Sequence, residues 1–62
     1  MLWLTRAASP QFYRPIRFRL IKKLDLTTYD GWIWLEGYQV DDRGDAIARR
    51  AVFVREQGLR KL

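Results

Sequence analysis

The sequence predicts an all-β domain of four or five antiparallel strands, and two observations carry this prediction. Residues 16–26 alternate between apolar and charged side chains, as a strand with one buried face does. Residues 32–55 contain two apolar runs separated by residues 42–44, the pattern of a β-hairpin. With 62 residues, the chain is long enough for one domain only, spanning 1–62.

The first part of the chain, residues 1–15, has two alternatives. Its first eight residues fit either a short strand or a partly irregular arm. Pro10 and Pro15 exclude a regular helix, because a proline disfavours helical geometry in the residue before it. We expect Phe12 and Tyr13 to anchor this segment to the core.

The segment 16–26 is expected to form a long strand with a bulge. Its two parities separate apolar from charged residues, Ile16, Phe18, Leu20, Leu24 and Leu26 against Arg17, Arg19, Lys23 and Asp25. Ile21 and Lys22 break this alternation. A bulge or sharp bend near residues 21–23 would restore it.

The hairpin is expected to turn through a three-residue loop, Asp42-Arg43-Gly44, with the glycine in the left-handed position. This loop places Asp41 opposite Asp45. Continued along both strands, the same register places Glu36 opposite Arg50, a favourable cross-strand pair. A slip of one residue would exchange the two faces of each strand.

Both faces of the predicted hairpin are rich in apolar residues. One carries Ile33, Leu35, Gly37 and Gln39 opposite Phe53, Ala51, Arg49 and Ile47; the other carries Trp32, Trp34, Glu36, Tyr38 and Val40 opposite Val54, Val52, Arg50, Ala48 and Ala46. Which face is buried stays open. The expected core comprises Ile16, Phe18, Leu20, Leu24, Ile33, Leu35, Val52 and Phe53.

The end of the chain completes the expected order of elements. Residues 55–58 suggest one short helical turn, which Gly58 ends. Residues 59–62 can add a last short strand. The chain resembles the SH3-like small barrels in element order and length. Its expected order is a strand, a long strand, a tight hairpin, one helical turn and a final strand. We therefore expect a fold of that type.

Composition excludes several kinds of chemistry. The chain has neither cysteine nor histidine, which removes disulfides, zinc-thiolate sites and the commonest general base. It has no phosphate-binding glycine motif. We expect no enzyme activity, no cofactor, no metal and no small-molecule substrate. The longest apolar run is four residues, so we expect no membrane span and a cytoplasmic location.

The charge of the chain, +5 overall, is unevenly distributed. Residues 1–24 hold six basic residues and no acid, whereas residues 25–47 hold six acids and one arginine. Residues 48–62 are again basic. Basic segments of this kind suit a nucleic-acid partner, although internal charge compensation with solubility also explains them.

The function we predict is non-catalytic binding of DNA or RNA, through backbone charge with aromatic stacking. The residues expected to bind are Arg17, Arg19, Lys22, Lys23, Trp32, Trp34, Arg49 and Arg50. The tryptophans have the alternative of filling the core. The rival prediction is a protein-interaction or self-associating module, which pairs as a homodimer or docks on a larger protein partner. An accessory subunit that shapes a larger enzyme is a further alternative.

Overall fold

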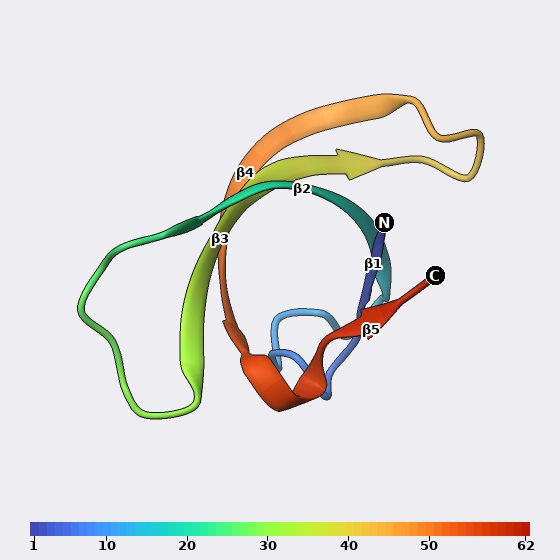
Figure 1. The fold of residues 1–62 in the computed structure, drawn as a ribbon. Helices are drawn as coiled ribbons and strands as arrows, with labels where there is room; N and C mark the ends of the chain where they lie inside the picture. The colour runs from blue at the N-terminus through green and yellow to red at the C-terminus, as the bar shows by residue number, and fades with distance from the viewer.

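The computed structural model describes all 62 residues, as five β-strands and one short 3₁₀ turn. In chain order the elements are β1 (Leu2–Leu4), β2 (Ile16–Leu24), β3 (Trp32–Val40), β4 (Ala46–Arg55), η1 (Glu56–Gly58) and β5 (Arg60–Lys61). Every strand pair is antiparallel, and the strands follow the order β4-β3-β2-β1-β5 (Figure 1). The all-β prediction is confirmed, as is the helical turn near the C-terminus. No helix of the chain has the length and apolar character that crossing a bilayer requires.

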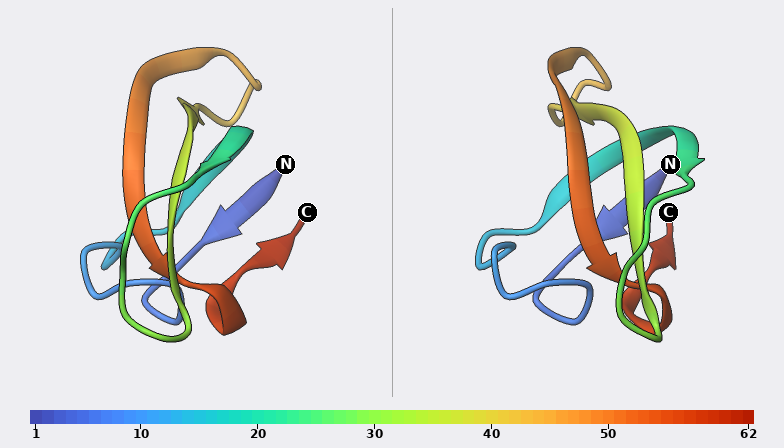
Figure 2. Two further views of the ribbon diagram at one scale, coloured as in Figure 1. Left: turned by 60° about the vertical axis from the view of Figure 1, so that its left-hand side comes forward. Right: turned by 90° about the vertical axis from the view of Figure 1, so that its left-hand side faces the viewer.

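The five strands form one open sheet that curls around a central core. Figures 1 and 2 show β1 and β5 on one side of this curl and the lower halves of β3 and β4 on the other. β4 and β5 are the two edges, and no strand pairing joins them. A closed barrel is therefore not confirmed.

The core lies on the concave side of the sheet, which we call the inner face. Eight buried residues form it: Leu4, Ala8, Phe12, Phe18, Ile33, Leu35, Val52 and Val54. Two of them come from the segment between β1 and β2, which closes one end of the core. A hydrogen bond from the Arg55 backbone N–H to the Ala8 carbonyl, at 2.6 Å, attaches the end of β4 to this segment. Phe12 therefore anchors the segment as expected, whereas Tyr13 is 75% exposed.

The predicted bulge in β2 is confirmed. Leu20 lies opposite Gly37 and Lys22 lies opposite Glu36, so Ile21 has no partner on β3. Because side chains alternate along a strand, the unpaired residue moves Lys22 to the same face as Arg19. The expected sorting is not restored beyond the bulge, because Lys23 lies on the inner face, opposite Leu35, and Leu24 lies on the opposite face, beside Trp34.

The hairpin tip also matches its prediction. The N–H of Asp41 donates to the carbonyl of Asp45 at 2.9 Å, and Gly44 has a φ of 87° in the left-handed region. The Asp41 carboxylate accepts hydrogen bonds from the backbone N–H groups of Arg43 and Asp45, each at 2.9 Å. This carboxylate therefore organises the loop instead of facing Asp45 as an unpaired charge.

Beyond the tip, the predicted hairpin register is wrong by one residue. Val40 lies opposite Ala46, as predicted, but Gln39 lies opposite Ala48, so Ile47 is an unpaired bulge residue. The expected pair of Glu36 and Arg50 does not form, because every residue of β4 after the bulge is shifted against β3.

The bulge has a clear packing benefit. It places Val52 opposite Leu35 and Val54 opposite Ile33, so four aliphatic side chains share the inner face. Without it, Phe53 would take the inner position. Phe53 instead lies half-exposed on the other face, contrary to the predicted core.

Other members of the predicted core differ in their burial. Phe18, Ile33, Leu35 and Val52 are buried as expected, and Ile16 is partly buried against them. The prediction that Leu20 belongs to the core is wrong, because this residue is 45% exposed, and Leu24 is only half-buried. Phe18 takes space beside Gly37, since a Cβ on that glycine would lie 2.7 Å from the Phe18 ring.

Candidate nucleic-acid interface

The convex side of the sheet, which we call the outer face, gathers most of the chain's strand-borne charge. Directly opposed residues of an antiparallel pair point to the same side, so the strand register defines this face. Its charged and large apolar members are Trp3, Arg17, Arg19, Lys22, Leu24, Trp32, Trp34, Glu36, Tyr38, Arg49, Phe53, Arg55 and Arg60. Six of these are basic and one is acidic.

A row of three residues crosses the middle of the outer face. Tyr38 on β3 lies between Arg19 on β2 and Arg49 on β4. The Arg19 guanidinium also donates a hydrogen bond to the Gly44 carbonyl at 3.2 Å, which fixes it against the hairpin tip. The row therefore presents a phenol ring flanked by two arginines.

A second row continues the basic surface toward the other edge of the sheet. Trp3 on β1 lies between Arg17 on β2 and Arg60 on β5. The Arg17 guanidinium lies 5.5 Å from the centroid of the Trp3 ring, in cation–π geometry. The same alternation of arginine and aromatic ring is thus repeated on this half of the face.

The acidic residue of the outer face, Glu36, is shared between two basic side chains. Arg49 donates to its carboxylate at 3.0 Å, and the Lys22 ammonium lies 4.0 Å from its other oxygen. These are the only two salt bridges of the chain. The remaining basic side chains of the face, Arg17, Arg19, Arg55 and Arg60, have no carboxylate partner.

An aromatic cluster of Tyr29, Trp32, Trp34 and Phe53 adjoins the basic rows. Phe53 is its centre, with its ring centroid 4.8 Å from that of Trp32 and 5.2 Å from that of Trp34. Tyr29, which is 76% exposed, meets Phe53 edge to face at 6.3 Å. The Arg55 guanidinium lies 5.0 Å from the Trp32 ring. This cluster gives the face π surface next to positive charge.

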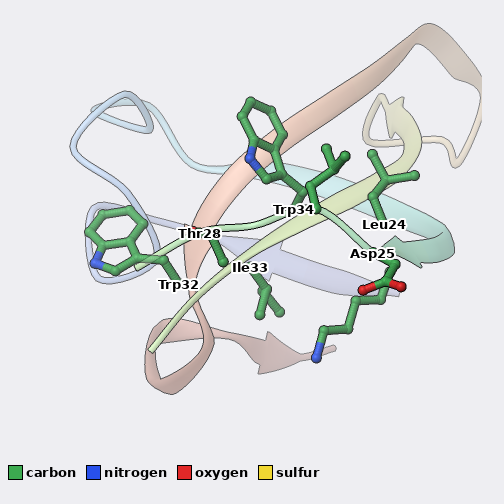
Figure 3. A pocket seen from close by; sticks show the side chains of 8 residues that line it. Leu24, Asp25, Thr28, Trp32, Ile33 and Trp34 are labelled. Atoms are coloured by element: carbon green, nitrogen blue, oxygen red, sulfur yellow. The ribbon is translucent and has the colours of Figure 1, made fainter. Parts of the chain in front are cut away.

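A pocket of about 430 Å³ lies at the end of the aromatic cluster (Figure 3). β2 and β3 are paired as far as Leu24 and Trp34, after which the chain from residue 25 swings away from β3 (Figure 1). The pocket occupies this fork, and we call it the fork pocket. Its lining residues are Lys23, Leu24, Asp25, Leu26, Thr28, Trp32, Ile33 and Trp34.

Six of the eight residues predicted to bind share the outer face: Arg17, Arg19, Lys22, Trp32, Trp34 and Arg49. The structure separates the other two from them. Arg50 lies opposite Gly37 on the inner side, where it donates to Gln39 at 2.9 Å and covers the Phe12 ring. Lys23 lies opposite Leu35, also on the inner side, because the β2 bulge exchanges its position with that of Lys22.

Several outer-face residues were missing from the sequence prediction. These are Trp3, Phe53, Arg55 and Arg60, together with Tyr29 of the adjoining aromatic cluster. A signal was present for Trp3, because it alternates with Leu2 and Leu4, which point inward. No comparable signal existed for Phe53, whose face depends on the bulge at Ile47.

Comparison with models of protein families, with curated proteins and with solved structures gives no match for this chain.

Proposed function

We propose that this protein is a small, non-catalytic nucleic-acid-binding domain whose outer face contacts the phosphate backbone. The observation that carries the proposal is the composition of that face, with six basic side chains, one acid and two groups of aromatic rings. Arginine contacts phosphate oxygens through charge-assisted hydrogen bonds. Aromatic rings beside a basic groove are a common means of holding unpaired bases.

The distribution of ion pairs supports the same proposal. Glu36 neutralises part of the charge of Lys22 and Arg49, but the four other basic residues of the face have no acidic partner in the chain. Two of these, Arg17 and Arg55, lie against tryptophan rings, which hold the guanidinium groups close to the surface. A polyanion would supply the missing partners and would release counterions on binding.

The test is a titration with DNA duplex, single-stranded DNA and RNA at two salt concentrations. The variant is Arg17→Ala with Arg19→Ala. On duplex DNA it should reduce the dependence of log K on log salt by about two, since each phosphate contact contributes about 0.9. Arg6→Ala with Arg14→Ala is the matched control, because it removes the same charge from exposed positions of the 5–15 segment.

The two double variants together decide the proposal. We expect the affinity of the control variant to fall only slightly, because its net positive charge is lower. Equal losses in both variants would show that overall charge, and not the outer face, attracts the nucleic acid. Absence of binding to all three probes at low salt would overturn the proposed function.

A second candidate, a protein-interaction or self-associating module, is favoured by exposed apolar groups at the two bulges. Ile21 and Ile47 are 45% and 58% exposed, and Leu20 is 45% exposed. Apolar groups exposed in this way suit a protein partner. Light scattering over a range of concentrations checks this candidate; a stable oligomer without nucleic-acid binding would favour it.

We also propose that the fold is of the SH3-like small-barrel type. The order of the elements supports this, as does the strand order, in which β1 lies between β2 and β5 and the sheet curls around one core. An NMR structure would check it through contacts between the inner faces of β1 and β4. A flat sheet without those contacts would contradict the assignment.

A further inference from the structure

The fork pocket is large enough for a small ligand and is lined mainly by apolar residues. Its volume of about 430 Å³ lies in the lower part of the range of roughly 300–1,000 Å³ that small-ligand sites occupy. Five of its eight lining residues are apolar, and two of those are tryptophans whose rings lie on the same side of β3 (Figure 3). Flat, apolar walls of this kind suit a flat ring.

Three polar residues complete the lining, Lys23, Asp25 and Thr28. A few polar groups among apolar walls fix the orientation of a ligand and decide its specificity. The carboxylate of Asp25 only accepts hydrogen bonds when ionised, so it selects a donor. It also repels a phosphate group. The Lys23 ammonium in the same lining only donates, so the polar side of the pocket offers one acceptor and one donor. It fits a neutral ring on which an amino group stands beside an acceptor atom.

The position of the pocket connects it to the basic rows. Its walls Leu24, Trp32 and Trp34 belong to the outer face, whereas Lys23 and Ile33 lie on the inner side. The row next to Leu24 and Trp34 is that of Lys22 and Glu36. Beyond it lies the row of arginines around Tyr38. A strand whose phosphates contact these rows would therefore bring one of its bases to the mouth of the fork.

We infer that the fork pocket binds one unpaired, amino-bearing base of single-stranded nucleic acid. This inference rests on the proposed function. A base within a duplex is stacked on both sides and cannot enter a pocket without being extruded, which costs a few kcal/mol. An amino group such as N4 of cytosine is the natural donor to Asp25. At the position of this amino group, thymine and uracil carry the carbonyl oxygen O4, which a carboxylate repels.

The first test compares oligo-dC, oligo-dT and a mixed-sequence duplex, each of about 12 nucleotides, by fluorescence anisotropy at neutral pH and low salt. Oligo-dC should bind about tenfold more tightly than oligo-dT, the size of one good base contact. The variant Asp25→Asn should remove most of this difference, because an amide both donates and accepts. Equal affinity for oligo-dC and oligo-dT in the wild type would overturn the inference.

The second test fills the pocket. Thr28→Phe adds a ring to a residue of the lining, and Thr27→Phe adds the same ring to its exposed neighbour, which is not part of the lining. Thr28→Phe should abolish the preference for oligo-dC while the salt-dependent binding persists, and Thr27→Phe should leave both unchanged. Unaltered discrimination in Thr28→Phe would show that the base is bound elsewhere.

The two proposals fail in different ways. If the duplex binds as tightly as oligo-dC, with normal salt dependence and with loss in Arg17→Ala/Arg19→Ala, the outer face binds nucleic acid and the pocket plays no part. If no probe binds at low salt, the proposed function fails and the inference fails with it. In that second case the pocket would be free to receive an apolar side chain of a protein partner.

Discussion

Trp32 and Phe53 stack on the outside of the sheet, with ring centroids 4.8 Å apart and ring planes inclined by 19°. The contact is diagonal, because Trp32 lies opposite Arg55 and Phe53 lies opposite Trp34. It depends on the bulge at Ile47, since an unbulged β4 would point Phe53 into the core. Aromatic surface is thus displaced to the outer face while β4 supplies valines to the inner one.

Phe18 lies in the core and Phe53 on the outer face, so truncating each to alanine should cost very different amounts of stability. Phe18 is fully buried, so Phe18→Ala should cost about 3–5 kcal/mol, comparable with the total stability of a domain of this size. Phe53→Ala removes only half-buried contacts and should cost about 1 kcal/mol. Urea denaturation measures both. Equal losses would contradict the placement of Phe53 on the outer face.

Removing the acid of the outer face should strengthen nucleic-acid binding. Glu36→Gln releases Arg49 and Lys22 from their ion pairs, and both then become available to phosphate. Stability should change by less than about 1 kcal/mol, because both basic partners are largely exposed. Anisotropy titrations at low salt would detect the tighter binding. Glu56→Gln, in the 3₁₀ turn, is the control with the same change of charge; an equal gain there would contradict a local role of Glu36.

The close approach of β2 to Gly37 predicts a strong effect of a single methyl group. A Cβ at this position would collide with the backbone carbonyl of Arg19 and lie 2.7 Å from the Phe18 ring. Gly37→Ala should therefore cost about 2–3 kcal/mol through overpacking. Gly44→Ala meets no neighbouring atom and should cost only the strain of its positive φ, about 1 kcal/mol. Thermal unfolding of the two variants checks this order, and a reversed order would show that β2 packs differently.

The hairpin tip offers a matched pair of aspartates. Asp41 accepts two backbone hydrogen bonds within the loop, whereas Asp42 beside it is exposed and accepts none from the protein. Asp41→Ala should cost about 1–2 kcal/mol, while Asp42→Ala should be close to neutral. Urea denaturation would show the difference, and hydrogen exchange should report faster opening of residues 43–45 in Asp41→Ala. Two equally mild effects would mean that the loop holds its shape without this carboxylate.

Local patterns were sufficient to predict most of the fold. The alternation of residues 16–26 predicted both β2 and its bulge, because one misplaced pair, Ile21 and Lys22, marks where the period breaks. The turn at Asp42-Arg43-Gly44 was predicted because glycine is the residue that adopts a positive φ readily. Both signals lie within a few residues of the feature that they predict.

The register of the hairpin could not be predicted in the same way. No break in alternation marks Ile47, because residues 46–54 contain apolar side chains at both parities. The plausible pair of Glu36 and Arg50 supported the wrong register, whereas Arg49 reaches the same carboxylate from the neighbouring position. The choice depends on which arrangement fills the core, with Val52 and Val54 against Phe18, and that is a property of the whole sheet.

The site residues predicted from a local pattern were placed correctly, whereas the one predicted from the hairpin register was not. Arg17, Arg19 and Lys22 were grouped by a pattern local to β2, and the structure keeps them together. Arg50 was assigned through the hairpin register and lies on the inner side instead. The fork pocket had no signature in the sequence, since it depends on where two strands cease to pair.

The unpaired residue Ile47 reverses which side of the sheet each following residue of β4 faces. Positions 48–55 keep their assignment to core or surface only while one extra residue separates them from the tip. Deleting Ile47 would exchange the two sides of this part of β4 at once, turning Val52 and Val54 outward and Arg49, Phe53 and Arg55 inward. During divergence of such a sequence, the number of residues between the loop and the core is therefore constrained, in addition to the loop residues Asp41 and Gly44.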